Sequence, residues 1–458
     1  MEEKTFDKII KEIVALLEEK KYVMARNKIL ENNEVDIAEI IEEILEELDL
    51  ERAILVYRML PKNISVDVFS YLPVDDQVAM IHGITDKETK HIMDELDFDD
   101  MIDVLDELPA NVVDKILEKV SKAERSRINT FLNYPETSAG SLMTPDYISL
   151  RKDMTVGQAM AYIKHEGMDR ETVYTCYVKD ERRTLIGIVS LRTLVVKDDH
   201  AVIESLMHED FISVNVLDDQ EEVSEAFKKY GFLAMPVVDK EGRLVGIITV
   251  DDILDVIEAE TTEDFQKMAG VASSTEEYLD MSVWKHFKNR IPWLFVLMCS
   301  YVITGSIITN FESVLSQVIS LVAYLPMLMG TGGNSGSQSA TLVIRGMALG
   351  DVELKDAGKV LWKEARVSFF IGVVLSGLNF LRICYLDGQG PWIGLTVCGS
   401  MLVIVMAAKI IGSMLPMLAK KVGIDPALMA SPMIASLTDM VSVVTYFAMA
   451  TFILGIHA

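Results

Sequence analysis

Residues 324–346 read YLPMLMGTGGNSGSQSATLVIRG, and they belong to a stretch, 313–344, that runs for 32 residues without a charged side chain. This is longer than the roughly 20 residues that a plain helix needs to cross a bilayer. Within it, GTGGNSGSQSAT at 330–341 concentrates glycines and side-chain oxygens. Glycines in a membrane permit close helix packing or expose backbone carbonyls, so the stretch indicates a specialised part of a membrane domain.

Other apolar stretches surround this one and predict an α-helical membrane domain over residues 287–458 with five transmembrane helices. The further stretches are Ile291–Thr309, Val367–Leu381, Pro391–Ala419 and Pro426–Ala458. The short third stretch is flanked by Lys363, Arg366 and Arg382. The long side chains of these residues can extend to the membrane surface, so the helix can cross the bilayer although its apolar stretch is short.

The distribution of basic residues predicts the orientation of these helices. If the N-terminus is inside, the cytosolic flanks carry ten Lys and Arg residues, whereas the outside loops carry only Arg382. An excess of Lys and Arg on the cytosolic side is the general rule. We therefore expect a multi-pass protein of the plasma or inner membrane, embedded in the lipid bilayer, with a cytosolic N-terminus and an outside C-terminus.

The formal net charge of −27 is unevenly distributed. Residues 281–458 carry 12 Lys/Arg and 8 Asp/Glu, so residues 1–280 have a net charge of −31. Such an acidic excess repels phosphate groups and argues against a nucleic-acid partner, but it suits cations or simple solubility. No nucleophile–base pair or nucleotide-binding loop stands out, so we do not expect an enzyme.

The N-terminal part contains a repeat in which an apolar residue recurs every 12 positions from Leu48 to Val120. The residue that follows each is a helix N-cap or a first-turn proline. These residues are Asp49, Pro61, Pro73, Thr85, Asp97, Pro109 and Ser121. The repeat predicts that residues 1–135 form an acidic, all-α superhelical N domain of short stacked helices.

Residues 136–258 show short β runs that alternate with helices, in two copies. The runs VYTCYV (173–178) and LIGIVS of the first copy correspond to AMPVV and LVGIITV of the second. We expect an α/β pair with copies over 142–203 and 204–258. A charged connecting helix over 259–286 then leads into the membrane.

The closing patterns of the two copies, GIVSLRT at 187–193 and GIITVDD at 246–252, resemble those of tandem CBS domains. The resemblance implies a nucleotide site, here at Ser190, Arg192, Thr249 and Asp252, that would take ATP. Nucleotide-binding members carry an Asp for the ribose where the first copy has Thr193. Dimer packing of the pair without a ligand is therefore the alternative.

Asp439 is the one carboxylate within the last apolar stretch. A carboxylate near mid-membrane costs several kcal/mol unless it meets water, a cation or a partner. Ser436 and Ser442 share its helix face, which favours a pore or ion site. The alternative is an ion pair with Lys409 on the preceding helix.

The glycine-rich run also offers oxygen ligands, of the kind that a hard cation such as Mg²⁺ prefers. A ring of carbonyls and amides, with a carboxylate below it, would suit a hydrated ion. Plain packing of helices through small residues is the alternative.

Three motifs resemble the MgtE family of Mg²⁺ channels: the opening stretch at 324–346, VGIDPALMASP at 422–432 and ASLTDMV at 435–441. The order of domains is also the same over essentially the whole chain. The resemblance implies a homodimer with a pore on its two-fold axis. Asp439 would bind hydrated Mg²⁺ there, with Gly330, Asn334 and Gln338 along the pore.

The same resemblance implies regulatory Mg²⁺ sites. Glu260 and Glu263 of the connecting helix, acting as a plug, would share Mg²⁺ with Asp425. Further ions would lie between the N domain and the CBS pair. The acidic candidates there are Asp97, Asp99, Asp100, Asp103, Asp218, Asp219, Asp252 and Asp255.

The chain departs from the family pattern at three membrane positions. Members often have Asn where Ser337 stands and Gly where Ser442 stands, and Lys409 replaces a residue that is usually uncharged. These changes leave Asp439 in place, but they bear on conductance and selectivity.

Together these observations predict a Mg²⁺-selective channel or transporter that imports Mg²⁺. It would close when cytosolic Mg²⁺ bridges the opposed acids of the N domain, CBS pair and plug. The alternatives are a non-conducting membrane Mg²⁺ sensor and a transporter of another divalent cation such as Co²⁺. A coupled anion carrier is disfavoured, because chloride channels with CBS pairs have more spans and carry the pair after them.

Overall fold

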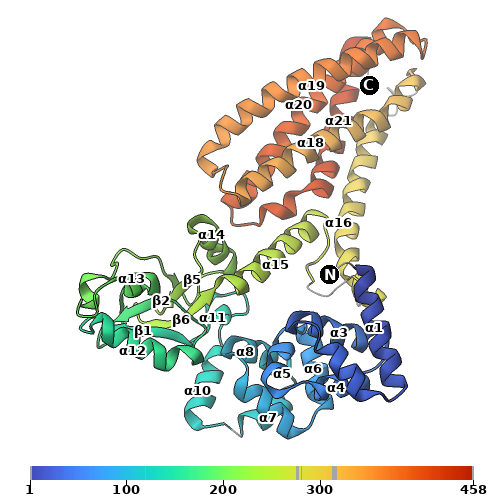
Figure 1. Ribbon diagram of the computed structural model, residues 1–458. Helices are drawn as coiled ribbons and strands as arrows, with labels where there is room; N and C mark the ends of the chain where they lie inside the picture. Colours follow the sequence, from blue (N-terminus) through green and yellow to red (C-terminus); the bar gives the residue numbers. More distant parts are fainter. Residues whose placement is uncertain (1–2, 119, 275–277, 280, 312–316, 456–458) are drawn as a thin grey trace. The chain divides into compact units, whose positions relative to one another are not determined.

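The computed structural model describes residues 3–118, 120–274, 278–279, 281–311 and 317–455. They form two compact units, Met1–Ile257 and Glu258–Ala458, which are described separately. Short helices and two small sheets make up the first unit, and long helices make up the second (Figure 1).

The first unit begins with a run of short helices that confirms the predicted all-α N domain. They are α1 (Glu3–Glu18), α2 (Tyr22–Ile29), α3 (Glu34–Glu47), α4 (Leu50–Met59), α5 (Lys62–Ser70), α6 (Val74–Gly83), α7 (Asp86–Glu95), α8 (Phe98–Glu107), α9 (Ala110–Leu117) and α10 (Lys122–Phe131). Each residue predicted to start a repeat is the N-cap of one of the helices α4 to α10. Thr85 and Glu88 form a capping box at α7, for example. The apolar faces meet in one core, in which Val56, Val68 and Val104 are fully buried.

Two similar three-stranded sheets follow and confirm the duplicated α/β pair. The strands are β1 (Tyr147–Arg151), β2 (Thr172–Lys179) and β3 (Leu185–Ser190) in one sheet, and β4 (Val214–Asn215), β5 (Ala234–Val238) and β6 (Leu244–Thr249) in the other. In each sheet the first strand is parallel to the second, which is antiparallel to the third. The associated helices are α11 (Ala139–Leu142), α12 (Val156–Glu166), α13 (Leu191–Val196), α14 (Gln220–Tyr230) and α15 (Val250–Met268).

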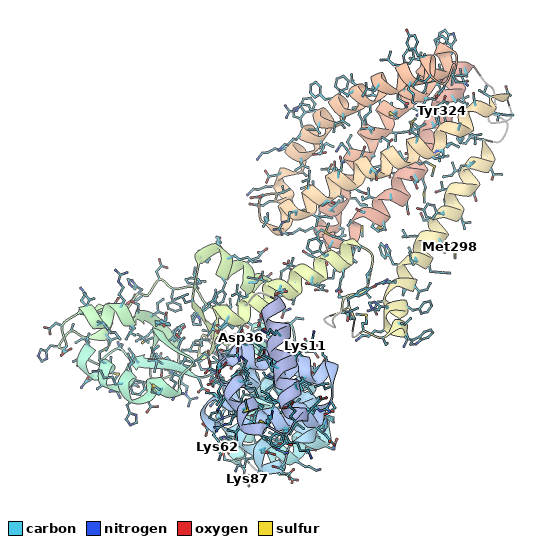
Figure 2. All side chains as sticks on the ribbon, turned by 45° about the vertical axis from the view of Figure 1, so that its right-hand side comes forward. Lys11, Asp36, Lys62, Lys87, Met298 and Tyr324 are labelled. Carbon is cyan, nitrogen blue, oxygen red and sulfur yellow. The ribbon has the colours of Figure 1, made fainter. Side chains whose placement is uncertain are left out.

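The second unit contains a long helix at each of the five predicted spans. They are α16 (Val283–Asn310), α18 (Leu325–Ala348), α19 (Ala357–Tyr385), α20 (Pro391–Lys421) and α21 (Ser431–Leu454). Among the described residues, four of them (α16, α19, α20 and α21) are long and apolar enough to cross a membrane. The glycine- and serine-rich α18 is the fifth of these long helices. Exposed apolar side chains such as Met298 on α16 suit contact with lipid (Figure 2).

Helix α18 packs closely against both α20 and α21, and its glycines make this approach possible. A Cβ atom added to Gly332 would meet the Oγ of Ser442 on α21 and the side chain of Ile404 on α20. One turn further, Gly336 lies so near Gly412 of α20 that a Cβ on Gly412 would strike the Gly336 carbonyl oxygen. Close packing by small residues therefore describes the buried side of the glycine-rich run.

Replacing Gly412 by alanine should destabilise the membrane unit, because the new methyl group would press on main-chain atoms that a rotamer change cannot move. We expect a loss of about 1–3 kcal/mol, typical of an overpacked core. The midpoint of thermal unfolding of the detergent-solubilised protein measures it. Gly377→Ala on α19 is the matched control, since nothing lies within 4 Å of its added Cβ. Equal midpoints for the two variants would contradict the close contact of α18 with α20.

Candidate ion-binding site

The glycine-rich run has a polar face opposite its packing face. Gly330, Asn334 and Gln338 follow one another at intervals of four residues and are all exposed in the isolated chain. Residues spaced in this way lie on one side of a helix. The run is part of the continuous helix α18, so its carbonyls serve the helix's own hydrogen bonds. The ligands that this face offers are therefore side-chain amides rather than a ring of carbonyls.

Asp439 lies in the first half of α21 and is half-buried. Within the described part of the chain, its carboxylate has neither a hydrogen bond nor an ion pair. The residue before it, Thr438, is buried and packs against Gly333 and Gly336 of α18. Asp439 thus stands beside the glycine-rich helix as an ionisable group that no described residue pairs with.

Ser436 and Ser442, predicted to share the face of Asp439, are instead buried within the chain. The hydroxyl of Ser442 points toward Gly332 of α18. Both hydroxyls lack a hydrogen-bond partner among the described residues. The structure therefore places these two serines inside the helix bundle, whereas Asp439 keeps an exposed edge.

Lys409 does not neutralise Asp439, as the alternative interpretation required. Its side chain is only 4% exposed, and its Nζ donates a hydrogen bond to the Oγ of Ser339 on α18 at 3.2 Å. No ion pair joins Lys409 to Asp439 in the described residues. The lysine is thus engaged with a different part of the bundle, and the carboxylate stays available for a cation.

Near the start of the second unit, a lysine stands between two acids that the sequence assigned to a shared Mg²⁺. The Nζ of Lys267 on α15 is 2.7 Å from the Oε1 of Glu263 and 2.9 Å from the Oδ2 of Asp425. Burial lowers the pKa of Lys267, but the two carboxylates raise it overall. Glu260 lies about one turn earlier on α15. This part of α15 is therefore joined to the 422–432 loop by an ammonium group.

The first unit gathers several acids of the N domain and the CBS pair. Burial, reinforced by neighbouring charges that include Asp252, raises the pKa of Asp99 to about 9. Burial and the charge of Asp97 likewise raise the pKa of Asp100 and Glu171, each to about 7. Asp99 Oδ1 is buried and has no partner among the described residues. These carboxylates therefore oppose one another's ionisation.

Glu171 was not predicted from the sequence, because only the fold brings the residue before β2 to the N domain. Of the predicted acids, Asp97 and Asp103 are exposed. The charge of Asp255 contributes to the raised pKa of Asp252. Asp218 and Asp219 have local roles, in a turn and at the N-cap of α14. In the described residues, no three His, Cys, Asp or Glu side chains converge closely enough to hold a metal ion.

A cavity of about 550 Å³ lies between the two CBS copies. It is lined by aromatic and polar side chains, including Ser190, Asp210, Tyr177, Tyr230 and Phe232. The hydroxyl of Tyr177 is fully buried and unpartnered within the described chain. Only Ser190 of the four residues predicted for a nucleotide lines this cavity.

The other three predicted nucleotide residues lie elsewhere. Thr249 donates its hydroxyl to Asp252 at 2.6 Å, and Arg192 is exposed on α13. Thr193, which stands in place of the family Asp, hydrogen-bonds to Ser190 instead. The acid of the family motif is thus absent from this position, and Asp210 is a carboxylate in the lining of the cavity.

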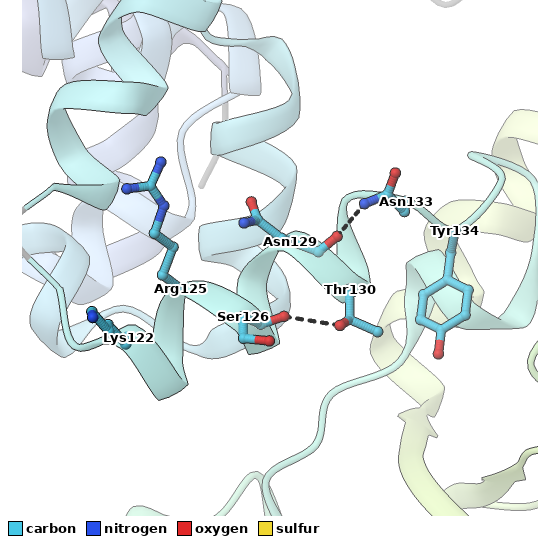
Figure 3. A pocket seen from close by; sticks show the side chains of 7 residues that line it. All are labelled: Lys122, Arg125, Ser126, Asn129, Thr130, Asn133 and Tyr134. Carbon is cyan, nitrogen blue, oxygen red and sulfur yellow. Dashed lines mark hydrogen bonds between the residues drawn. The ribbon is translucent and has the colours of Figure 1, made fainter.

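A second hollow, of about 770 Å³, lies along α10 (Figure 3). Its side chains are amides, hydroxyls, an aromatic ring and the cations Lys122 and Arg125. The Asn133 amide and the Thr130 hydroxyl donate to backbone carbonyls of the preceding helical turn. With no carboxylate in its lining, this hollow does not suit a metal cation.

The fold and these sites define a membrane protein in which a helical repeat domain and a CBS pair precede a helical membrane unit. A family profile described as a divalent cation transporter, MgtE, matches residues 325–449. The MgtE intracellular N domain matches 33–137, and CBS domains match 139–198 and 203–259.

Relatives and a solved structure agree with these profiles. The chain is 36% identical to the magnesium transporter MgtE of Thermus thermophilus, over 96% of this chain and 99% of that protein. It is 32% identical to the Bacillus subtilis MgtE, over 98% of both. The cytosolic domain of the Mg²⁺ channel MgtE, crystallised with ATP, matches 54% of this chain and 99% of its own, at 33% identity and a TM-score of 0.50. The chain therefore belongs to the MgtE family.

The raised carboxyl pKa values predict how the stability of the first unit depends on pH. Asp99 titrates near pH 4 when unfolded and near 9 when folded. Its contribution to stability is therefore complete below pH 4 and is lost as the pH rises toward 9. Thermal unfolding of residues 1–258 in a chelator, followed across this range, measures the decline.

Asp99→Asn should flatten this pH dependence, because asparagine mimics the protonated acid. The exposed Asp75 serves as the control, since Asp75→Asn should leave the slope unchanged. A slope that survives in Asp99→Asn would show that the burial of Asp99 does not govern it.

Proposed function

We propose that this chain conducts Mg²⁺ across the membrane past Asp439. The observation that carries the proposal is the carboxylate of Asp439 within an apolar helix, which has no partner among the residues described by the structure. Such a group is tolerated in a membrane where it meets water or a cation. The amides of Asn334 and Gln338 are exposed, and so is Gly330, which precedes them on α18. This face suits a hydrated ion that keeps several of its waters. The names of the relatives support Mg²⁺ as the transported ion.

The conducting form is proposed to be a homodimer with the path between its subunits. Within one chain, Gly330, Asn334 and Gln338 face outward, so a single copy does not enclose them. A second copy placed against this face would turn two exposed polar stripes into one lined path. The N-terminus would be cytosolic and the C-terminus outside, as the basic flanks predict, and the membrane potential would favour import.

Closure is proposed to depend on cytosolic Mg²⁺. When Mg²⁺ is scarce, the acids around Asp99, Asp100, Glu171 and Asp252 repel one another, by roughly 4 kcal/mol for unit charges ~4 Å apart at an effective dielectric of ~20. Mg²⁺ bound between them would relieve this repulsion and favour the compact, closed form. Each bound ion shifts the equilibrium between the open and closed forms only by the difference in its binding free energy for the two forms.

The cavity between the CBS copies is proposed to bind an adenine nucleotide. The crystallisation of a relative's cytosolic domain with ATP supports this assignment. Tyr177, Tyr230 and Phe232 provide aromatic surface for a base, and Ser190 and Asp210 provide polar groups. This assignment uses different residues from those that the sequence pattern suggested, apart from Ser190.

Asp439→Asn should reduce Mg²⁺ flux by roughly thirtyfold, since it removes an attraction of about 2 kcal/mol for a divalent cation. Uptake of Mg²⁺ into liposomes, with Mg²⁺ on one side or on both, measures the flux. Asp351→Asn, at an exposed acid in the loop after α18, is the control.

Three outcomes separate the candidate functions in this assay. Flux through Asp439→Asn at the wild-type rate would refute the assigned path. No flux through the wild type with any divalent ion would favour a non-conducting Mg²⁺ sensor. Faster flux of Co²⁺ than of Mg²⁺ would favour a transporter of another divalent cation.

Lys267→Gln should increase flux at low cytosolic Mg²⁺ and make closure depend more strongly on added Mg²⁺. The substitution leaves Glu263 and Asp425 opposed without the ammonium group that joins them. Flux as a function of internal Mg²⁺ measures the change, with Lys359→Gln, an exposed ion-paired lysine, as the control. An unchanged dependence on Mg²⁺ would remove Lys267 from the gating mechanism.

A further inference from the structure

A buried array of polar groups connects three membrane helices on the packing side of α18. Lys409 of α20 donates to the Oγ of Ser339, and that hydroxyl donates in turn to the Oε2 of Glu364 on α19, at 2.6 Å. Ser339 is fully buried and Lys409 almost so. One hydroxyl therefore links an ammonium group to a carboxylate, using both its acceptor and its donor capacity.

The position of the array places this charge close to the proposed ion path. Ser339 lies one residue beyond Gln338 and less than one turn from Gly336, which packs against Thr438, the neighbour of Asp439. A lysine at such a site is expensive to bury without an opposite charge. It would also repel a passing cation, and the repulsion of a divalent ion is twice that of a monovalent one.

In the described residues, the hydrogen bonds of Lys409 and Ser339 lead to one carboxylate, that of Glu364. Glu364 forms no ion pair closer than 4 Å in the described chain, so its charge is not already committed to another cation. The array therefore holds one negative charge, on Glu364, and one positive charge, on Lys409. The hydroxyl of Ser339 on α18 connects them.

We propose that Glu364 is a specificity-determining residue that cancels the charge of Lys409 through Ser339. The field along the path is then set by Asp439. Lys409 on its own would repel divalent cations, and the negative charge of Glu364 reduces this repulsion. This inference rests on the proposed conduction of Mg²⁺, but it concerns residues outside the face that contacts the ion.

The test uses the full-length protein in liposomes and a pair of substitutions. Glu364→Gln should reduce Mg²⁺ flux roughly tenfold, whereas Na⁺ flux in divalent-free solution should fall only roughly threefold, because the electrostatic energy scales with valence. Adding Lys409→Met to Glu364→Gln should restore Mg²⁺ flux to within about twofold of wild type. Glu353→Gln, at an exposed acid paired with Lys355, is the control and should leave flux unchanged.

Wild-type Mg²⁺ flux in Glu364→Gln, or no recovery in the double variant, would overturn the proposal. If Glu364→Gln does not fold, Lys409→Met alone decides: it should conduct Mg²⁺ at least as fast as the wild type, because it leaves the negative charge of Glu364 uncancelled, and a loss of flux there would also overturn the proposal. A merely structural role would lower Mg²⁺ and Na⁺ flux by the same factor.

The failure of this inference can be distinguished from the failure of the proposed function. If the wild type conducts no divalent ion, conduction fails, and thermal unfolding then tests the pair. Glu364→Gln should lower the midpoint, and Lys409→Met should recover it. If the wild type conducts and depends on Asp439 but Glu364→Gln conducts normally, only the charge-compensation inference is lost.

Discussion

A carboxylate that lies in an apolar helix, with no partner among the residues that the structure describes, is the constraint on which the membrane unit depends. Asp439 is half-buried in α21, and Lys409, the cation of the neighbouring span, is bound to Ser339 instead. Hydrocarbon cannot accommodate such a charge without a large cost. In the proposed function the surface around Asp439 meets water and cations, and this requirement organises the proposed path and the proposed pairing of two subunits.

Helix α18 meets this requirement by having two different sides. Its glycines let the backbones of α18 and α20 approach at Gly336 and Gly412, which fixes the position of the helix. Asn334 and Gln338 are thereby held on the opposite, exposed face. The departures from the family pattern also fall around this helix: Ser442 faces Gly332, and Lys409 reaches Ser339.

Carboxylates also repel one another outside the membrane unit, where solvent and ions can modulate the repulsion. Buried acids of the N domain and the CBS pair raise one another's pKa, with Asp99 as the extreme case. In the second unit, the ammonium group of Lys267 stands between Glu263 and Asp425. Both arrangements are part of the proposed response to cytosolic Mg²⁺, because each places carboxylates where their mutual repulsion is incompletely screened by water.

The sequence by itself determined the features that depend on residues a few positions apart. The 12-residue repeat located the N-caps of α4 to α10, the β runs located four of the six strands, and the long apolar stretches located five long helices. Only the tertiary structure decided the partners of side chains distant along the chain. Glu171 joins the acids around Asp252, Glu364 is linked to Lys409 through Ser339, and Ser436 turns into the bundle. Helix caps and hydrophobic periods are local, whereas the partner of a buried charge is chosen by how the helices pack.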